Sequence, residues 1–230
     1  MKDWNIKKQR KETEKSVMSI FIDSANLTHV KTALELGWVK GITTNPLLLA
    51  QSEMKASVLL KTLKELSDGP IFYQLTSDTF EASVAEAHQS LEILEKQLVV
   101  KLPPTELGFR LCSELSSRMA CCPTAIYSAA QALVAREAGA QYPAVYVNRA
   151  TRLMGDGLKL LEEISRVLEN SSTRLLAASL KSPLEASQAY SAGAQDLTLP
   201  YQTLMEMTKH PLSDEAIKQF QDGGKGLNQT

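Results

Sequence analysis

One lysine of this chain stands inside an apolar run. Lys101 is the fourth residue of the segment 98–102 (LVVKL), whose branched apolar residues are typical of a buried strand. Lysine is almost never fully buried unless it is paired. Burial disfavours the ammonium form, and a neutral amine can attack a carbonyl carbon to form a Schiff base. Lys101 is therefore a candidate nucleophile; the alternative is a lysine just past its strand that extends into water.

Further polar residues stand at the ends of other short apolar runs. They are Asp23, Thr43, Asn45, Gln74, Thr124, Tyr146, Arg149, Ser179 and Lys181. Thr43 and Asn45 are two residues apart, so their side chains point to the same side of a strand, and the same holds for Ser179 and Lys181. Asp23 offers a carboxylate for proton transfer; its alternative role is to cap the helix that follows.

Arg149, Ser179 and Lys181 form a candidate anion site. A guanidinium and a hydroxyl suit a phosphate, and barrels often bind phosphate in the loops near their last strands. The alternative is that Arg149 and Lys181 are solvated loop charges. The three histidines do not gather in any metal-ligand spacing, so we expect no metal site: His29, His88 and His210.

The elements that must position these residues form a regular alternation. Eight short apolar runs occur at residues 20–22, 41–44, 71–75, 98–102, 124–127, 144–148, 175–179 and 196–199. Successive runs begin about 20–30 residues apart, the length of a βα unit. The stretches between them have helical periodicity, clearest at 79–98 and 157–168. The Ala-rich segment 128–138 ends at Gly139, a helix stop signal.

This alternation predicts an α/β fold, a single (β/α)8 TIM barrel with a C-terminal helical extension. The competing architecture is a doubly wound open sheet, which usually has a Gly-rich phosphate turn, and no G-x-G-x-x-G or P-loop pattern occurs here. We expect residues 1–17 to be a mobile N-terminal extension, 18–222 the barrel with its C-terminal helix, and 223–230 a flexible tail. In a barrel, the polar strand ends meet at one face.

The composition excludes several classes of protein. The 230 residues carry 25 Lys and Arg against 26 Asp and Glu, and a net charge of −1 argues against a general nucleic-acid binder. No apolar run approaches the roughly 20 residues of a membrane span, so we expect no membrane partner. Cys112, Cys121 and Cys122 cannot form a disulfide framework. We expect them to be core residues of a cytoplasmic protein.

Five segments, in order, resemble the small transaldolase / fructose-6-phosphate aldolase family. They are residues 21–25 (FIDSA), 41–46 (GITTNP), 99–103 (VVKLP), 146–149 (YVNR) and 177–181 (AASLK). The combination of T-T-N-P after the second run with V-K-L-P at the fourth is the specific part of the match. The likeness extends from about Met18 to Gln221. It implies class I aldolase chemistry on a TIM barrel, with no metal and no cofactor.

The resemblance implies a role for each matching residue. Lys101 matches the lysine that forms the Schiff base. Asp23 matches the carboxylate that assists proton transfer around the carbinolamine. Thr43 and Asn45 match residues that line the pocket floor and hold substrate hydroxyls. Thr124 matches the residue that holds the catalytic water.

The resemblance also implies how phosphate is held and which reaction dominates. Arg149 and Ser179 match the phosphate-binding pair, and Lys181 lies close by. Transaldolases typically have Glu at strand 3 and Phe at strand 6, whereas Gln74 and Tyr146 match the aldolases. A Gln amide can only orient water, so acid–base work passes to the tyrosine. We therefore expect reversible cleavage of fructose 6-phosphate to dihydroxyacetone and glyceraldehyde 3-phosphate.

Other activities stay open beside this one. A transaldolase would transfer a dihydroxyacetone unit between sugar phosphates, as in the pentose phosphate pathway. A non-catalytic sugar-phosphate sensor would need no buried lysine, and a metal-dependent aldolase would need a ligand cluster. The chain departs from the family pattern at 47–49 (LLL), where a Ser-rich segment is usual, and at Pro104 and Thr105.

The resemblance further implies a homo-oligomer, a ring that in small members is often a decamer. In such rings the C-terminal helix packs on a neighbouring subunit. Residues 214–220 could form that helix, with Ile217 and Phe220 as its anchors. The alternative is a helix that packs on its own barrel.

Overall fold

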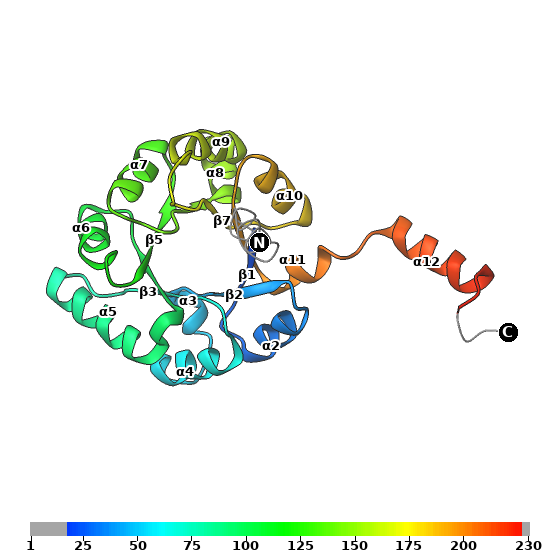
Figure 1. The fold of residues 1–230 in the computed structure, drawn as a ribbon, viewed down its shortest axis with the longest axis horizontal. Coiled ribbons are helices and arrows are strands. Elements are labelled where there is room, and N and C mark those ends of the chain that lie inside the picture. The colour runs from blue at the N-terminus through cyan, green and yellow to red at the C-terminus, as the bar shows by residue number, and fades with distance from the viewer. Residues whose placement is uncertain (1–17, 227–230) are drawn as a thin grey trace, which may run out of the picture.

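A computed structural model of the protein describes residues 18–226, and within it eight parallel strands form a closed barrel (Figure 1). The strands are β1 (Ser19–Asp23), β2 (Val39–Thr43), β3 (Ile71–Gln74), β4 (Leu98–Leu102), β5 (Ala120–Ile126), β6 (Ala144–Tyr146), β7 (Leu176–Ala178) and β8 (Asp196–Leu199). Each strand pairs with its neighbours in the chain, and β1 pairs with β8 to close the ring. The predicted TIM barrel is confirmed. The predicted extension at 1–17 and most of the predicted tail lie outside the described residues.

Helices follow the strands and surround the barrel (Figure 1). They are α2 (Leu27–Glu35), α3 (Pro46–Leu49), α4 (Ala56–Leu66), α5 (Phe80–Leu94), α6 (Glu106–Leu115), α7 (Ala129–Glu137), α8 (Val147–Met154), α9 (Gly157–Leu168), α10 (Pro183–Ser191), α11 (Tyr201–Glu206) and α12 (Pro211–Gly223), with a short 3-10 turn η1 (Glu95–Gln97) before β4. Several begin at a side-chain cap directly after a strand, as at Asn45, Ser128 and Ser182. A cap oxygen accepts a backbone N–H that would otherwise lack a partner, so each cap fixes where a helix leaves the barrel rim.

Only β4 and β8 keep both of their predicted boundaries, and the differences at β5 and β6 have a clear physical reason. β5 begins at Ala120 and continues through Pro123, although a proline lacks the N–H that a central strand normally uses. β6 ends at Tyr146, because Val147 already begins α8 and is buried there with Ala150, one helical turn further on. Valine is as common in strands as in buried helix positions, so the apolar pattern of residues 144–148 did not separate the two.

A small cluster of buried residues fills the interior of the barrel, separate from the main core between strands and helices. Its residues are Phe21, Phe72, Val99, Cys122, Tyr142, Ala144 and Leu176. The rings of Phe21 and Tyr142 both approach Phe72, with centroids 5.2 Å away in each case. Such aromatic pairs each contribute about 0.5–1.5 kcal/mol beyond the area they bury. Phe72, Ala144 and Leu176 of this cluster also line the cavity at the carboxyl ends of the strands, so the cluster forms the inner end of that cavity.

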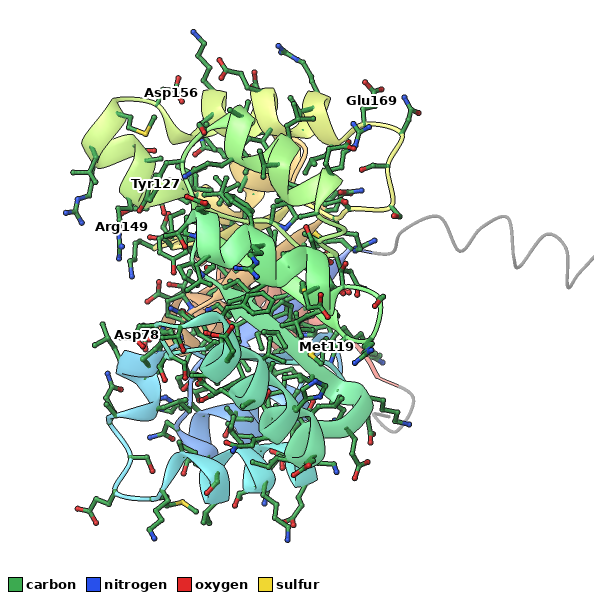
Figure 2. All side chains as sticks on the ribbon, turned by 90° about the vertical axis from the view of Figure 1, so that its left-hand side faces the viewer. Asp78, Met119, Tyr127, Arg149, Asp156 and Glu169 are labelled. Carbon is green, nitrogen blue, oxygen red and sulfur yellow. The ribbon has the colours of Figure 1, made fainter. Side chains whose placement is uncertain are left out.

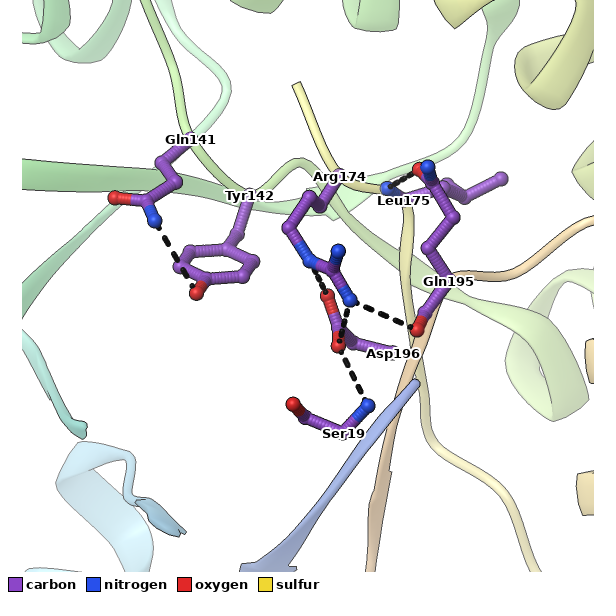
Figure 3. Close-up of polar contacts among 7 residues, drawn as sticks. All are labelled: Ser19, Gln141, Tyr142, Arg174, Leu175, Gln195 and Asp196. Atoms are coloured by element: carbon purple, nitrogen blue, oxygen red, sulfur yellow. Dashed lines mark hydrogen bonds and ion pairs between the residues drawn. The ribbon is translucent and has the colours of Figure 1, made fainter. Parts of the chain in front are cut away.

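An ion pair joins the amino ends of the last strands to the first (Figure 3). Asp196, which is fully buried, accepts hydrogen bonds from Arg174 Nε and Nη2, both at 2.7 Å, and from the backbone N–H of Ser19 at 3.0 Å. Gln195 Oε1 accepts from the N–H of Leu175 in the same network. These bonds fasten the β8–β1 seam. Polar residues at this face of a TIM barrel serve stability rather than chemistry.

The C-terminal helix α12 extends away from the barrel (Figure 1). It has no buried residue, and Leu212, Ile217 and Phe220 are exposed by 69%, 51% and 73%. In this structure, therefore, the helix does not pack on its own barrel. Within residues 18–226, none of the helices has the length and apolar character required to cross a bilayer.

Candidate active site

A cavity of about 180 Å³ opens at the carboxyl ends of the barrel strands. It is lined by all of the predicted site residues except Gln74, together with Thr198 and apolar residues of the barrel core: Asp23, Thr43, Asn45, Phe72, Lys101, Thr124, Ala144, Tyr146, Arg149, Leu176, Ala178, Ser179, Lys181 and Thr198. Figure 2 shows Arg149 at the same end of the barrel as Asp78, Tyr127 and Asp156, opposite Met119 and Glu169. The strand ends therefore gather the polar residues that lie far apart in the sequence.

Lys101 lies on β4 and is only 6% exposed. Its Nζ donates a hydrogen bond to the carbonyl oxygen of Thr44 at 2.6 Å, which fixes the amine in the cavity. Burial lowers the pKa of Lys101 below its ordinary 10.5, against the opposing influence of Cys122 and Asp23. The thiol of Cys122 is itself buried and has a pKa of about 12, so near neutral pH it carries no charge to offset this. The alternative of a lysine extending into water is excluded.

Asp23 ends β1 and takes no part in capping α2, whose N-cap is Asn26. Burial raises the pKa of the Asp23 carboxyl, while Lys101, the Thr43 hydroxyl and Lys181 act in the opposite direction. The shift makes this carboxyl better able to hold a proton than an ordinary aspartate. A carboxyl that keeps its proton longer and an amine that loses it sooner form a suitable pair for proton transfer.

A pair of threonine hydroxyls holds Asp23 in place. Thr43 Oγ1 donates to Asp23 Oδ1 at 2.8 Å and lies 2.6 Å from Thr198 Oγ1. Because Thr43 has one hydroxyl proton and gives it to Asp23, Thr198 must donate to Thr43. Thr43 therefore orients the carboxylate. Thr198 was missed from the sequence, since a threonine within an apolar run is an ordinary strand residue.

Tyr146 and Thr124 lie together on the other side of the cavity. Thr124 Oγ1 donates to Tyr146 Oη at 3.4 Å, and the Arg149 guanidinium stands 5.0 Å from the centre of the tyrosine ring. Burial raises the pKa of Tyr146, Asp23 adds to the rise, and the Thr124 hydrogen bond and Arg149 oppose it. The strand pairing shifts between Thr124 and Ile126, a bulge of the kind that redirects side chains beside active sites.

Gln74 lies outside this cavity. Its backbone pairs with that of Lys101 in the β3–β4 register, but the residue lines a neighbouring cavity of about 320 Å³ together with Leu49 and Met54. The adjacent Tyr73 faces away from the barrel and donates its hydroxyl to Glu86 on α5 at 2.7 Å. The structure therefore separates Gln74 from the other predicted site residues.

The candidate anion site lies at the rim. Arg149 comes from the start of α8, and Ser179 and Lys181 come from the loop between β7 and α10. Ser179 has a backbone φ of 60°, a conformation that non-glycine residues rarely adopt and that tends to occur at ligand sites. Arg149 and Lys181 are exposed yet line the cavity, so their charges face whatever enters it.

No group of three His, Cys, Asp or Glu side chains in the described part of the chain could hold a metal ion. Cys112, Cys121 and Cys122 are free and buried, as the sequence predicts. The cavity brings together a buried amine, a carboxyl, a phenol and two cationic side chains at its rim.

Known proteins resemble this chain over most of its length. Residues 20–229 match the family described as Transaldolase/Fructose-6-phosphate aldolase. The chain belongs to the transaldolase/fructose-6-phosphate aldolase family. A probable transaldolase of Thermoanaerobacter sp. (strain X514) is 36% identical over 208 residues, which cover 89% of this chain and 96% of the relative. A probable transaldolase of Geobacter metallireducens is 34% identical over 206 residues, 88% of this chain and 96% of the relative.

A solved structure of a mandelate oxidase variant superposes on this family member with a TM-score of 0.58. The two share 14% sequence identity, and the match covers 89% of this chain and 70% of the other. At that identity the likeness shows the barrel fold alone. Membership of the transaldolase/fructose-6-phosphate aldolase family makes the protein an enzyme of aldolase or transaldolase type that acts on sugar phosphates.

Proposed function

We propose that the protein is a class I aldolase that cleaves and forms fructose 6-phosphate through a Schiff base on Lys101. The observation that carries the proposal is the buried Lys101 amine, held by the Thr44 carbonyl in a cavity that also contains a carboxyl of raised pKa and a cationic rim. A lysine with a lowered pKa is the nucleophile that such chemistry requires at neutral pH.

The first half of the reaction uses Lys101 and Asp23. The neutral amine attacks the C2 carbonyl carbon, and the carbonyl oxygen gains a proton to give a carbinolamine. Asp23, whose pKa is raised by burial, supplies the proton with which the hydroxyl leaves as water. The resulting iminium accepts the electron pair of the C3–C4 bond when that bond breaks.

The second half requires that the C4 hydroxyl lose its proton. We assign this transfer to Tyr146 acting through a water held with Thr124, since these two hydroxyls adjoin in the cavity. The raised pKa of Tyr146 keeps the phenol protonated before substrate binds, so it acts as a relay that gives one proton while it takes another. Gln74 lines the neighbouring cavity and is given no role in this transfer.

The remaining residues hold the substrate. Arg149, Ser179 and Lys181 bind its phosphate, which places C2 toward the buried amine. Asn45 Oδ1 already accepts the N–H of Leu48 at 3.0 Å, so the amide NH₂ group is the part left to donate to a substrate hydroxyl. Glyceraldehyde 3-phosphate leaves first, and protonation and hydrolysis of the enamine then release dihydroxyacetone.

Transaldolase activity is the second candidate, and the relatives' printed names favour it. In that reaction the enamine on Lys101 waits for an acceptor aldehyde. Tyr146 favours the aldolase, because a tyrosine hydroxyl can protonate the enamine system through water without an acceptor, which a phenylalanine could not do.

The test is an assay of the purified protein with fructose 6-phosphate and no acceptor, following release of glyceraldehyde 3-phosphate. Sustained turnover that Lys101→Met lacks would support the aldolase. A single turnover that resumes on addition of erythrose 4-phosphate would show a transaldolase instead. Covalent trapping of the ketone with borohydride that persists in Lys101→Met would reject the Schiff-base assignment.

Tyr146→Phe separates the two activities further. For an aldolase, this variant should lose cleavage of fructose 6-phosphate more than it loses transfer to erythrose 4-phosphate. Equal loss of both activities would remove the argument from Tyr146. We further propose a homo-oligomeric ring and a cytoplasmic location, which light scattering and cell fractionation would test.

A further inference from the structure

One carboxylate connects the two segments that carry the candidate anion site, the start of α8 and the loop between β7 and α10. Glu185 Oε1 accepts a hydrogen bond from Asn148 Nδ2 at 2.6 Å, and its Oε2 accepts the backbone N–H of Lys181 at 2.7 Å. Asn148 directly precedes Arg149 at the start of α8, and Lys181 lies two residues after Ser179. Each oxygen of this single side chain therefore fixes one of the two segments.

The position of Glu185 is itself well fixed. It is the third residue of α10, and its backbone N–H donates to the Oγ of Ser182, the N-cap, at 3.1 Å. In a capping box the glutamate at this position bonds the N–H of the cap residue itself. Here it bonds the preceding residue, Lys181, and reaches across to Asn148 on α8. Its contacts thus exceed what capping α10 requires.

The loop between β7 and α10 needs such a connection to the start of α8. Ser179 has a φ of 60°, and a strained backbone of this kind persists only where its surroundings hold it. The N–H of Lys181 is occupied by Glu185, so it is not available to an anion. Phosphate would then be bound by side chains from both segments, whose separation has to be correct.

We propose that Glu185 is a positioning residue that sets the distance between Arg149 and the pair Ser179 and Lys181, and so determines how tightly the enzyme binds the phosphate of its substrate. This inference rests on the proposed function. Glu185 touches no substrate: it acts through Asn148 and the backbone of Lys181. Its loss should therefore affect phosphorylated substrates and spare those that lack a phosphate.

The experiment compares Glu185→Ala and Glu185→Gln in the full chain, with dihydroxyacetone and either glyceraldehyde 3-phosphate or glyceraldehyde. Glu185→Ala should raise the KM for glyceraldehyde 3-phosphate about tenfold, as expected when hydrogen bonds to a charged group are lost. Its kcat and its KM for glyceraldehyde should stay close to those of the wild type. Glu185→Gln should restore the KM, since the amide can accept from Lys181 and donate to a reoriented Asn148.

Glu81→Ala is the matched control, because Glu81 is an exposed acidic residue in the first turn of another barrel helix, α5. Asn148→Ala is a second variant, which breaks only the bond to α8 and leaves the start of α10 intact. It should raise the KM for glyceraldehyde 3-phosphate less than Glu185→Ala does. An unchanged KM in both variants, or an equal rise for both aldehydes, would overturn the proposal.

Calorimetric titration with inorganic phosphate keeps this test separate from the proposed function. If the wild type neither turns over fructose 6-phosphate nor is trapped on Lys101, the proposed function fails. The titration still decides about Glu185: weaker phosphate binding in Glu185→Ala, but not in Glu81→Ala, would support the positioning role. Equal phosphate binding by the wild type and Glu185→Ala would reject it.

Discussion

At the scale of single residues, burial moves the pKa values of Lys101 and Asp23 toward each other. It lowers the first and raises the second, because both charged forms lose their hydration in the same cavity. In the proposed reaction, a proton passes between the amine, the substrate oxygen and the carboxyl with a smaller free-energy difference than ordinary side chains would impose. One physical cause thus prepares both the nucleophile and the acid.

The pH dependence of imine formation should report this shift. The neutral fraction of Lys101 rises with pH, so borohydride trapping should reach half its maximal rate well below pH 10.5, the ordinary lysine pKa. The Asp23 carboxylate stabilises the ammonium, so Asp23→Asn should move the midpoint further down. In the unfolded chain Lys101 has its ordinary pKa and holds its proton more tightly than in the folded protein. The free energy of unfolding therefore rises with pH between the lowered pKa of the folded state and 10.5. A wild-type midpoint near pH 10.5, or an Asp23→Asn midpoint above that of the wild type, would contradict the assignment of Lys101 as the buried nucleophile.

Thr198 should affect the reaction rate only through Thr43, which orients Asp23. Thr198→Val keeps the shape of the side chain but removes the donor to Thr43, so Thr43 can turn away from Asp23. We expect kcat to fall about fivefold, equivalent to the roughly 1 kcal/mol of one hydrogen bond. Thr198→Ser should recover most of the rate. A kcat of Thr198→Val equal to that of the wild type, with an unchanged melting temperature, would show that this hydroxyl is dispensable.

Single residues also show where sequence reasoning succeeds. Lys101 could be recognised because a charge inside an apolar strand conflicts with its surroundings. Thr198 could not, because threonine fits a strand without any conflict. Gln74 was predicted from its place at the end of an apolar run and from the family likeness, yet it lines the neighbouring cavity, which its position in the strand did not reveal.

At the scale of elements, the division of the barrel into two ends follows from how its strands are tied. The carboxyl ends carry the cavity, whereas the amino ends of β7, β8 and β1 meet at the buried pair of Arg174 and Asp196. Repeated strand–helix alternation was enough to predict the barrel. The long-range pair was not predictable, because residues 174 and 196 become neighbours only once the barrel has closed.

Removing one partner of this pair should destabilise the fold without changing the chemistry. Arg174→Ala leaves the Asp196 carboxylate buried without its main charge partner, which typically costs about 3–5 kcal/mol of unfolding free energy. Denaturant unfolding measures the loss, and kcat/KM of the folded fraction should match the wild type. A variant with normal stability but impaired kcat/KM would assign this end of the barrel to function instead.

At the scale of the whole molecule, α12 stands out because it has no buried residue and does not pack on the barrel. Three large apolar side chains, Leu212, Ile217 and Phe220, face solvent along a helix that extends from the barrel. Exposing that much apolar surface is unfavourable, and a second copy of the chain is the partner that the proposed ring would provide.

The oligomer can be tested with the same helix. We expect light scattering of the full chain to give a multiple of the 25.3 kDa subunit mass, and Ile217→Ser with Phe220→Ser to lower it. The matched control is Gln219→Ser, a polar exchange on the same helix. A monomeric wild type, or a double variant of unchanged mass, would exclude α12 as the contact.

The aromatic cluster of Phe21, Phe72 and Tyr142 closes the inner end of the active-site cavity, which opens to solvent at the carboxyl ends of the strands. In the proposed reaction, the substrate fragment that is bound deepest in this cavity must leave after the fragment nearer its opening. A ketose bound with its carbonyl at Lys101 and its phosphate at the rim therefore gives up the phosphorylated fragment before the part held at the floor can escape. Order of release is thus imposed by the closed floor of the barrel, and a high concentration of the outer fragment should block the exit of the inner one.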